Sequence, residues 1–565
     1  MSAPAPHVVP TSIPEPSRTV DAVVVGAGFS GIDAVRQLAG LGLSVQAYEA
    51  GSDVGGTWYW NRYPGARCDC ISLEYQFTFD KTIVDEYRPD ERYPSQPVIL
   101  QYLNDVADRV GVREHFRFNT RVVAAAYDEA ENRWVVTTDD GENIACHYLV
   151  TAVGCLSAGQ VPGFPGLSQY HGETYHTSRW PHEGVDFTGK RVAVIGTGSS
   201  GVQVIPEVAK QASHLTVFQR TPAFSLDYGP LPLSDTEYRT FVDNFEDYVH
   251  KSRTTPSGQH TETLTQSAMD DSPQVREATY EDRWNRHRAI DLIACYPDLF
   301  TNRDANDTIS EFFRSKIRQK VTDPELAEKL SPRTYPLGAK RMTLNTDYFE
   351  TYNRDNVDLV SLREEPLVTF TPHGIRTEGA DYEVDAVVFA TGFDAVTGPL
   401  LNIDITGRDG HRLADAWMDG PVTYLGLAVS GFPNLLTITG PGSPNVLTNV
   451  VCAIEQHVDW IADAIKQWRA DGVEVVEADP QAQQEWTRTC AELATHTLYP
   501  EGNSWYTGAN IPGKPPVMMS YVGGLDQYRV ICDEVAADGY RGFVLTRDPE
   551  GAVDLTEAEQ RTGVS

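Results

Sequence analysis

Hydrophobic and polar positions alternate in blocks along the chain, and short apolar runs are followed by glycines and then by a helical pattern. The run from Val20 to Val25 predicts a buried parallel strand, and a second strand closes at Glu49 after one helix. The same order begins again at Arg191 to Ile195, where a helix and the strand sequence HLTVFQR follow. Each block therefore predicts a strand, a turn, a helix and a second strand, the building unit of a doubly wound α/β domain.

The first turn carries the spacing G-x-G-x-x-G at Gly26, Gly28 and Gly31. The first glycine allows the tight turn, the second lets a pyrophosphate approach the backbone, and the third lets the helix pack closely on the strand. The helix N-terminus then presents its partial positive charge to the phosphates. Glu49 is placed to accept hydrogen bonds from a ribose diol. The pattern predicts dinucleotide binding, and the alternative is merely a tight turn.

The second turn repeats this spacing at Gly196, Gly198 and Gly201, but its second strand ends in Arg220 and not in an acid. A guanidinium can fork onto a ribose 2′-phosphate, which a carboxylate would repel. We therefore expect this turn to bind NADPH. The alternative is that Arg220 is simply a solvent-exposed residue at the end of a strand. Two dinucleotide folds imply two cofactors, so the first fold, which ends in an acid, is expected to hold FAD.

Two later apolar strands, within His147–Ser157 and Tyr382–Ala395, end in small-residue turns that return the chain to the nucleotide-binding units. Residues 227–330 are charged and helix-compatible. The predicted fold is thus α/β, with two Rossmann-like dinucleotide-binding domains and a helical insertion. The expected segments are a flexible lead (1–18), the first part of the FAD domain (19–155), a linker with the first part of the NADP domain (156–226), the helical insertion (227–330), the second part of the NADP domain (331–385), the second part of the FAD domain (386–545) and a disordered tail (546–565).

The composition of the chain limits the classes of molecule that it can bind. With 565 residues and 41% hydrophobic content, the chain can form several cores, and its net charge of −33 argues against nucleic acid and anionic membranes. No apolar stretch approaches a membrane span, and the N-terminus lacks the features of a signal peptide. The eight cysteines are scattered without a C-x-x-C pair, so we expect reduced thiols, a cytoplasmic location and no metal. A monomer or weak homo-oligomer is expected.

The segment YHGETYHTSRWPH precedes the second turn and contains Tyr170, Gly172, His176, Trp180 and Pro181. Together with the two flanking glycine turns, it resembles the fingerprint of the type I Baeyer-Villiger monooxygenases. The sequence GGTWYWNRYPGARCD, residues 55–69, resembles the family's other signature. The likeness runs over about residues 20–545 and is greatest to the phenylacetone monooxygenases. Tyr170 departs from the phenylalanine that is usual in the family but keeps an aromatic ring.

The resemblance implies that NADPH reduces FAD, that O2 forms a flavin C4a-peroxide, and that this peroxide attacks a ketone to give an ester or lactone, with sulfoxidation as a side activity. It assigns Arg341, in GAKRM, as the catalytic cation beside the peroxide and Asp69 as the carboxylate that orients it. Lys340 would reach the NADP phosphate and Trp505 would fold over bound NADP. Leu447 would line the ketone pocket.

The resemblance also assigns residues to the two cofactors and to the linker. His176 is interpreted as a hinge anchor or as core packing, and a metal site at His171, His176 and His182 is not expected, because no cysteine or carboxylate stands at ligand spacing. The FAD set is Gly26, Gly28, Ser30, Gly31, Glu49, Gly56, Thr57, Trp58, Asp69, Tyr75 and Val122. The NADP set is Arg67, Cys68, Thr197, Gly198, Ser199, Ser200, Gly201, Gln203, Arg220, Thr221, Lys340, Arg341 and Trp505.

Three alternatives remain open from the sequence. A flavin-dependent N- or S-oxygenating monooxygenase would share both nucleotide folds, although its linker usually lacks the Trp180–Pro181 pair. An NADPH-dependent disulfide reductase would need a dithiol beside the flavin, and Cys68 and Cys70 have the less usual C-x-C spacing. A cofactor-binding protein without turnover is disfavoured by the presence of both Arg341 and Asp69.

Overall fold

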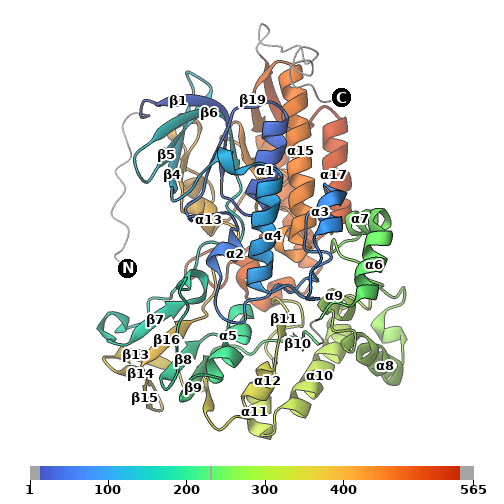
Figure 1. The fold of residues 1–565 in the computed structure, drawn as a ribbon. Helices are drawn as coiled ribbons and strands as arrows, with labels where there is room; N and C mark the ends of the chain where they lie inside the picture. The colour runs from blue at the N-terminus through green and yellow to red at the C-terminus, as the bar shows by residue number, and fades with distance from the viewer. Residues whose placement is uncertain (1–12, 230–231, 548–565) are drawn as a thin grey trace.

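The computed structural model describes residues 13–229 and 232–547, which form two α/β domains and a helical region beside them (Figure 1). Most of the predicted flexible lead and of the predicted tail, residues 1–12 and 548–565, lies outside the described residues. Each of these two predicted segments includes the end of a strand. The lead was expected to reach residue 18, but β1 (Arg18–Val25) begins there, and the tail was expected from residue 546, but β20 (Phe543–Arg547) ends at Arg547. Within the described ranges, no helix is long and apolar enough to cross a bilayer.

The first domain is built on an eight-stranded sheet in which β1 lies between β2 (Val45–Tyr48) and β6 (Asn143–Thr151), parallel to both. Alternate residues of β1 enter two different cores: Val24 packs with the helices on one face, and Val23 packs with the strands and loops on the other. Because both faces are covered, the strand reads as a continuous apolar run. The remaining strands of this sheet are β3 (Phe116–Arg117), β4 (Val122–Asp128), β5 (Arg133–Thr138), β17 (Asp404–Thr406) and β18 (Leu435–Thr437).

The second domain contains a five-stranded, all-parallel sheet in the order β12-β9-β8-β16-β7. The predicted boundary at 385/386 is wrong by one strand, because β16 (Ala386–Phe389) pairs with β7 and β8 and so belongs to the second domain. The linker fingerprint also contributes a strand, because β7 is the edge of this sheet. The other strands are β7 (Glu173–His176), β8 (Arg191–Ile195), β9 (His214–Gln219) and β12 (Val357–Ser361).

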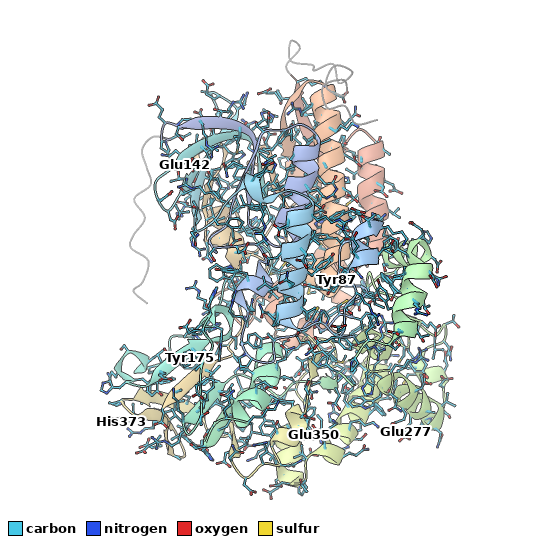
Figure 2. All side chains as sticks on the ribbon, in the orientation of Figure 1. Tyr87, Glu142, Tyr175, Glu277, Glu350 and His373 are labelled. Atoms are coloured by element: carbon cyan, nitrogen blue, oxygen red, sulfur yellow. The ribbon has the colours of Figure 1, made fainter. Side chains whose placement is uncertain are left out.

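The described residues of the segment expected to be a helical insertion form six α-helices, which Figure 1 shows in green and yellow-green beside the second domain. Their apolar side chains, drawn as sticks in Figure 2, form a core with Ile71, Leu73, Val84 and Tyr93 of the first domain. Ile317 of the insertion packs in another core with strands of the second domain, so the insertion contacts both domains. The helices are α6 (Asp235–Asp243), α7 (Phe245–Arg253), α8 (Pro273–Trp284), α9 (Ala289–Ile293), α10 (Arg303–Lys320) and α11 (Pro324–Lys329).

In the first domain, α1 (Phe29–Gly40) packs against the long helix α15 (Val450–Ala470) and buries a carboxylate between them. Asp33 is fully buried, accepts two hydrogen bonds from Arg36 at 3.0 and 2.6 Å, and leaves its second oxygen without a partner. Burial raises the pKa of Asp33 to about 7, and this effect exceeds the opposing attraction of Arg36. The ionised form is therefore unfavourable in the folded state.

We expect the difference in thermal stability between Asp33→Asn and the parent protein to shift in favour of the variant as the pH rises from about 4 to about 7. The folded pKa of Asp33 lies above its unfolded value, so its contribution is present in full below pH 4 and is lost by about pH 7, at no more than about 1.4 kcal/mol per pH unit. Unfolding midpoints of both proteins at pH 5 and pH 7.5 measure this change. Asp85→Asn, at an exposed position on α3 (Lys81–Glu86), is the matched control and should show the same difference from the parent at both pH values. A pH-independent difference for Asp33→Asn would contradict the expectation.

Candidate active site

The two predicted glycine turns have the same geometry. Gly26 and Gly196 take φ angles of +110° and +111°, a region that favours glycine. A Cβ at Gly31 would lie 1.8 Å from the carbonyl oxygen of Gly26, and a Cβ at Gly201 would lie 2.2 Å from that of Gly196. Each helix therefore starts in direct contact with the turn before it, as the spacing predicted.

The residues around the first turn fit a flavin dinucleotide. A Cβ at Gly56 would lie 2.7 Å from the Cα of Gly28, so two glycine backbones meet where a pyrophosphate has to approach the α1 N-terminus. Glu49 directly follows β2, and its carboxylate accepts backbone N–H bonds from Ala27 at 2.9 Å and Gly51 at 2.7 Å. These bonds hold the turn and the strand end together. Each carboxylate oxygen can accept further hydrogen bonds, so the predicted ribose contact stays compatible with the structure.

The second turn fits a phosphorylated dinucleotide. A Cβ at Gly198 would meet no described residue other than its chain neighbours within 4 Å, so the backbone at the α5 (Ser199–Ala209) N-terminus is open to a ligand. Lys340 donates to the carbonyl of Asn503 at 3.0 Å, and burial together with the charge of Arg220 lowers its pKa to about 8. Two cations that raise each other's energy in this way favour an anion between them. Arg220 and Lys340 were both predicted to contact NADP.

The predicted catalytic pair is in contact. Arg341 donates from Nε and Nη2 to the two oxygens of Asp69, both at 2.7 Å, and from Nη1 to the carbonyl of Val446 at 2.9 Å. Burial alone would lower the pKa of Arg341, but the ion pair with Asp69 raises it well above its usual range. The guanidinium thus stays charged and is held in a fixed plane by three acceptors. Such a group can stabilise an anion without giving up a proton.

Two chain segments that connect the domains, one around Gly159 and one around Phe393, run antiparallel beside the linker fingerprint. Gly159 bridges Phe393, and the N–H of Gln160 donates to the carbonyl of Gly392 at 2.9 Å. Nδ1 of His176 accepts the N–H of Ser178 at 3.0 Å, so Nε2 carries the proton that faces the carbonyl of Gln160 at 3.2 Å. Burial lowers the pKa of His176, which favours this neutral form. These contacts support the interpretation of His176 as an anchor of the connection.

A C-terminal loop connects the same parts of the molecule. Ser504 donates to the carbonyl of Ala339 at 3.1 Å, beside the segment that carries Arg341. Asn510 donates to the carbonyl of Phe393 at 2.8 Å in the interdomain connection, and Lys514 forms an ion pair with Asp394. Trp505, between these contacts, is partly buried against the same connection. The loop therefore lies over the junction of the two nucleotide folds, where the predicted role of Trp505 requires it.

Comparison with known proteins identifies the family. A model of flavin-binding monooxygenase-like proteins, FMO-like, matches residues 20–228. A Baeyer-Villiger monooxygenase of Pseudooceanicola batsensis is 43% identical over 533 residues, which cover 94% of this chain and 97% of that protein. The chain belongs to the Baeyer-Villiger monooxygenases.

Solved structures agree with this assignment and identify the cofactors. A structure described as oxidized steroid monooxygenase bound to NADP is 46% identical, with a TM-score of 0.89, 94% of this chain covered and 100% of that chain. A complex of a protein called OTEMO with FAD and NADP is 41% identical, with a TM-score of 0.90 and the same coverage. This Baeyer-Villiger monooxygenase therefore uses FAD and NADPH, and the predicted fold class is confirmed.

The structure weakens the disulfide reductase alternative. In this Baeyer-Villiger monooxygenase Cys68 and Cys70 are free and buried, and burial raises the pKa of both thiols, in Cys70 well above the usual value. A redox dithiol needs a thiolate at working pH. Relatives named for ketone oxidation, such as a cyclohexanone 1,2-monooxygenase of an Acinetobacter species that is 40% identical over 526 residues, support that activity. A phenazine N-monooxygenase of Lysobacter antibioticus is 41% identical over 536 residues, so N-oxygenation also occurs among the relatives.

Most of the other residues predicted to bind FAD or NADP in this monooxygenase lie at or near the two glycine turns. Trp58 donates from Nε1 to the Tyr75 hydroxyl at 3.1 Å, and Gln203 donates to the carbonyl of Arg67 at 2.9 Å. The Arg67 guanidinium itself is paired with Glu91 at 2.7 Å. The remaining predicted positions are Ser30, at the start of α1; Thr57, which begins the short helix α2 (Thr57–Trp60); Val122, which begins β4 and is buried; Ser199 and Ser200, which begin α5; Thr197, whose hydroxyl donates to the carbonyl of Thr221 at 2.9 Å; Gly172, Trp180 and Pro181, in the fingerprint; and Leu447, half-buried beside Val446.

The sequence did not reveal three contributors to the site of this monooxygenase. The carbonyl of Val446 accepts from Arg341, Tyr506 lies against the same guanidinium, and Arg363 adds its charge near Lys340. A backbone carbonyl leaves no residue signal, and Tyr506 lies next to the predicted Trp505 in a loop that has no periodic pattern. Arg363 follows β12, and only pairing of β12 with β9 brings it near Arg220.

Proposed function

We propose that this enzyme oxidises ketones to esters or lactones with the Arg341–Asp69 pair as its reaction centre, with NADPH as reductant and O2 as oxidant. The balanced reaction is ketone, NADPH, H⁺ and O2 giving ester, NADP⁺ and water. Bound reduced FAD supplies the activation of O2. The observation that carries the proposal is the permanently charged guanidinium, held by two bonds to Asp69 and one to the carbonyl of Val446.

Each of the named residues has a distinct task in this proposal. Arg341 stabilises negative charge on oxygen while the new C–O bond forms, and it does so without protonating that oxygen. Asp69 fixes the plane of the guanidinium. Leu447, next to the carbonyl that holds Arg341, borders the ketone. The loop that carries Trp505 excludes water from the reaction, which favours product over wasted oxidation of NADPH.

The substrate class follows from the apolar border at Leu447 and from the family. We propose cyclic and aryl ketones as substrates, with thioethers oxidised as a side reaction. The steroid monooxygenase relative makes a bulky polycyclic ketone a necessary member of any substrate panel. A cytoplasmic location and a monomeric or weakly associated state complete the proposal.

Isotope labelling tests the reaction. The purified holoenzyme is given NADPH, ¹⁸O2 and one of five compounds: cyclohexanone, an aryl methyl ketone, a polycyclic ketone, a thioether or a disulfide. We expect one labelled oxygen atom in the ester or lactone for each NADPH consumed. A disulfide should stimulate no NADPH consumption, because neither buried thiol is ionised. NADPH oxidation without label in any organic product would contradict the proposal.

A further inference from the structure

A group of positive charges lies at the ends of two neighbouring strands in the second domain. Arg220 directly follows β9 and Arg363 follows β12, the parallel neighbour of β9. Arg363 donates to the Thr221 hydroxyl at 3.4 Å, which directs it toward the segment after β9. Burial, the charge of Arg220 and the charge of Arg363 together lower the pKa of Lys340. The three side chains therefore share one region of the molecule.

These three cations have no carboxylate partner in the part of the chain that the structure describes. This is unusual for a protein with 79 acidic and 46 basic residues, in which most arginines form ion pairs. The two acids next to Arg363 are engaged elsewhere: Glu364 pairs with Lys329 at 3.2 Å, and Glu365 accepts from the Tyr382 hydroxyl at 2.9 Å. Like charges gathered without a counterion raise each other's energy until an anion binds.

The open backbone at Gly198 and the α5 N-terminus place the pyrophosphate of a dinucleotide in the same domain. In a dinucleotide-binding fold, residues at the end of the second strand contact the ribose 2′ position. The 2′-phosphate of bound NADP would therefore lie at the end of β9. We propose that Arg363 is a third cation of this 2′-phosphate site and sets the preference of the enzyme for NADPH over NADH. The inference rests on the use of NADPH in the proposed function and adds a residue that distinguishes the two nucleotides.

Binding measurements test Arg363 without relying on turnover. Dissociation constants of NADP⁺ and NAD⁺ are measured by calorimetry on the FAD-loaded enzyme, for the parent, Arg363→Ala and Arg363→Lys. We expect Arg363→Ala to weaken NADP⁺ binding about 10-fold and to leave NAD⁺ binding unchanged, because only NADP⁺ carries the charged acceptor. Arg363→Lys should fall between the parent and alanine, since it keeps the charge but loses the fork.

Two further variants make the outcome decisive. Arg354→Ala removes an exposed arginine that follows α12 (Tyr348–Thr351) and whose guanidinium donates to the Asn356 side chain, and it should leave both constants unchanged. Arg220→Ala should weaken NADP⁺ at least as much as Arg363→Ala. If Arg220→Ala has this effect and Arg363→Ala does not, or if Arg363→Ala weakens both nucleotides equally, the inference is overturned. If neither arginine discriminates the nucleotides while ketone oxidation persists, the proposed reaction stands and the phosphate site is wrong.

Discussion

Arg341→Ala is expected to lower ester formation by about 10²- to 10³-fold, the effect of losing one preorganised charge-stabilising donor, or about 2.7 to 4 kcal/mol. Reduction of FAD by NADPH should continue, because the substitution leaves the glycine turns and the proposed phosphate-binding cations Arg220, Lys340 and Arg363 in place. The measurement is rapid-mixing absorbance of the flavin under anaerobic conditions, combined with product analysis in air. The variant should therefore separate the reductive half of the reaction from the oxidative half.

Two variants control this experiment. Arg376→Ala breaks an exposed pair with Asp381, with donor distances of 2.6 and 2.9 Å, so it removes the same fork from a remote β-hairpin and should leave the rate of ester formation unchanged. Asp69→Asn keeps the charge of Arg341 but removes its anchoring anion, and we expect a smaller loss than for Arg341→Ala. Ester formation at the parental rate in Arg341→Ala would remove the centre of the proposed mechanism.

The sequence predicts the scaffold well, because the determinants of the scaffold are local. Strand β8 was expected from Arg191 to Ile195 and is found there, because a strand covered on both faces has to be apolar throughout. The glycine spacing likewise gives the close helix contacts at Gly31 and Gly201 directly. In contrast, the apolar strand β16 looked like a return to the first domain, and only its hydrogen bonds to β7 and β8 assign it to the second.

The proposed reaction centre could not be derived from local sequence pattern. Arg341 and Asp69 are 272 positions apart, and each alone has the appearance of an ordinary loop residue. Only the resemblance to the family predicts this pair, and the structure shows the two side chains in contact. Arg363 was missed because neither spacing nor resemblance marks it. Its proximity to Lys340 follows from sheet order, and it has no carboxylate partner among the described residues because Glu364 and Glu365 bond elsewhere.

The second large effect is expected at the glycines where helix and turn touch. Gly201→Ala places a methyl group 2.2 Å from the carbonyl oxygen of Gly196, so the start of α5 has to move by about 1 Å to reach an ordinary contact distance. We expect FAD to remain bound and NADP⁺ binding to weaken about 100-fold, since a displacement of about 1 Å at a positioned site has costs of that order. Gly31→Ala should act on the other cofactor, because its methyl group would lie 1.8 Å from the carbonyl oxygen of Gly26.

The two substitutions are measured side by side, by flavin absorbance of the purified proteins and by calorimetry with NADP⁺. Gly40→Ala is the matched control, because it lies at the end of α1 and an added methyl group would meet no described residue outside its own helix turn within 4 Å. It should retain both cofactors, with stability equal to or above that of the parent. The expected pattern is reciprocal: Gly31→Ala weakens FAD binding, Gly201→Ala weakens NADP⁺ binding, and the control weakens neither. Loss of FAD from Gly201→Ala with NADP⁺ binding intact would mean that the two turns have been assigned to the wrong cofactors.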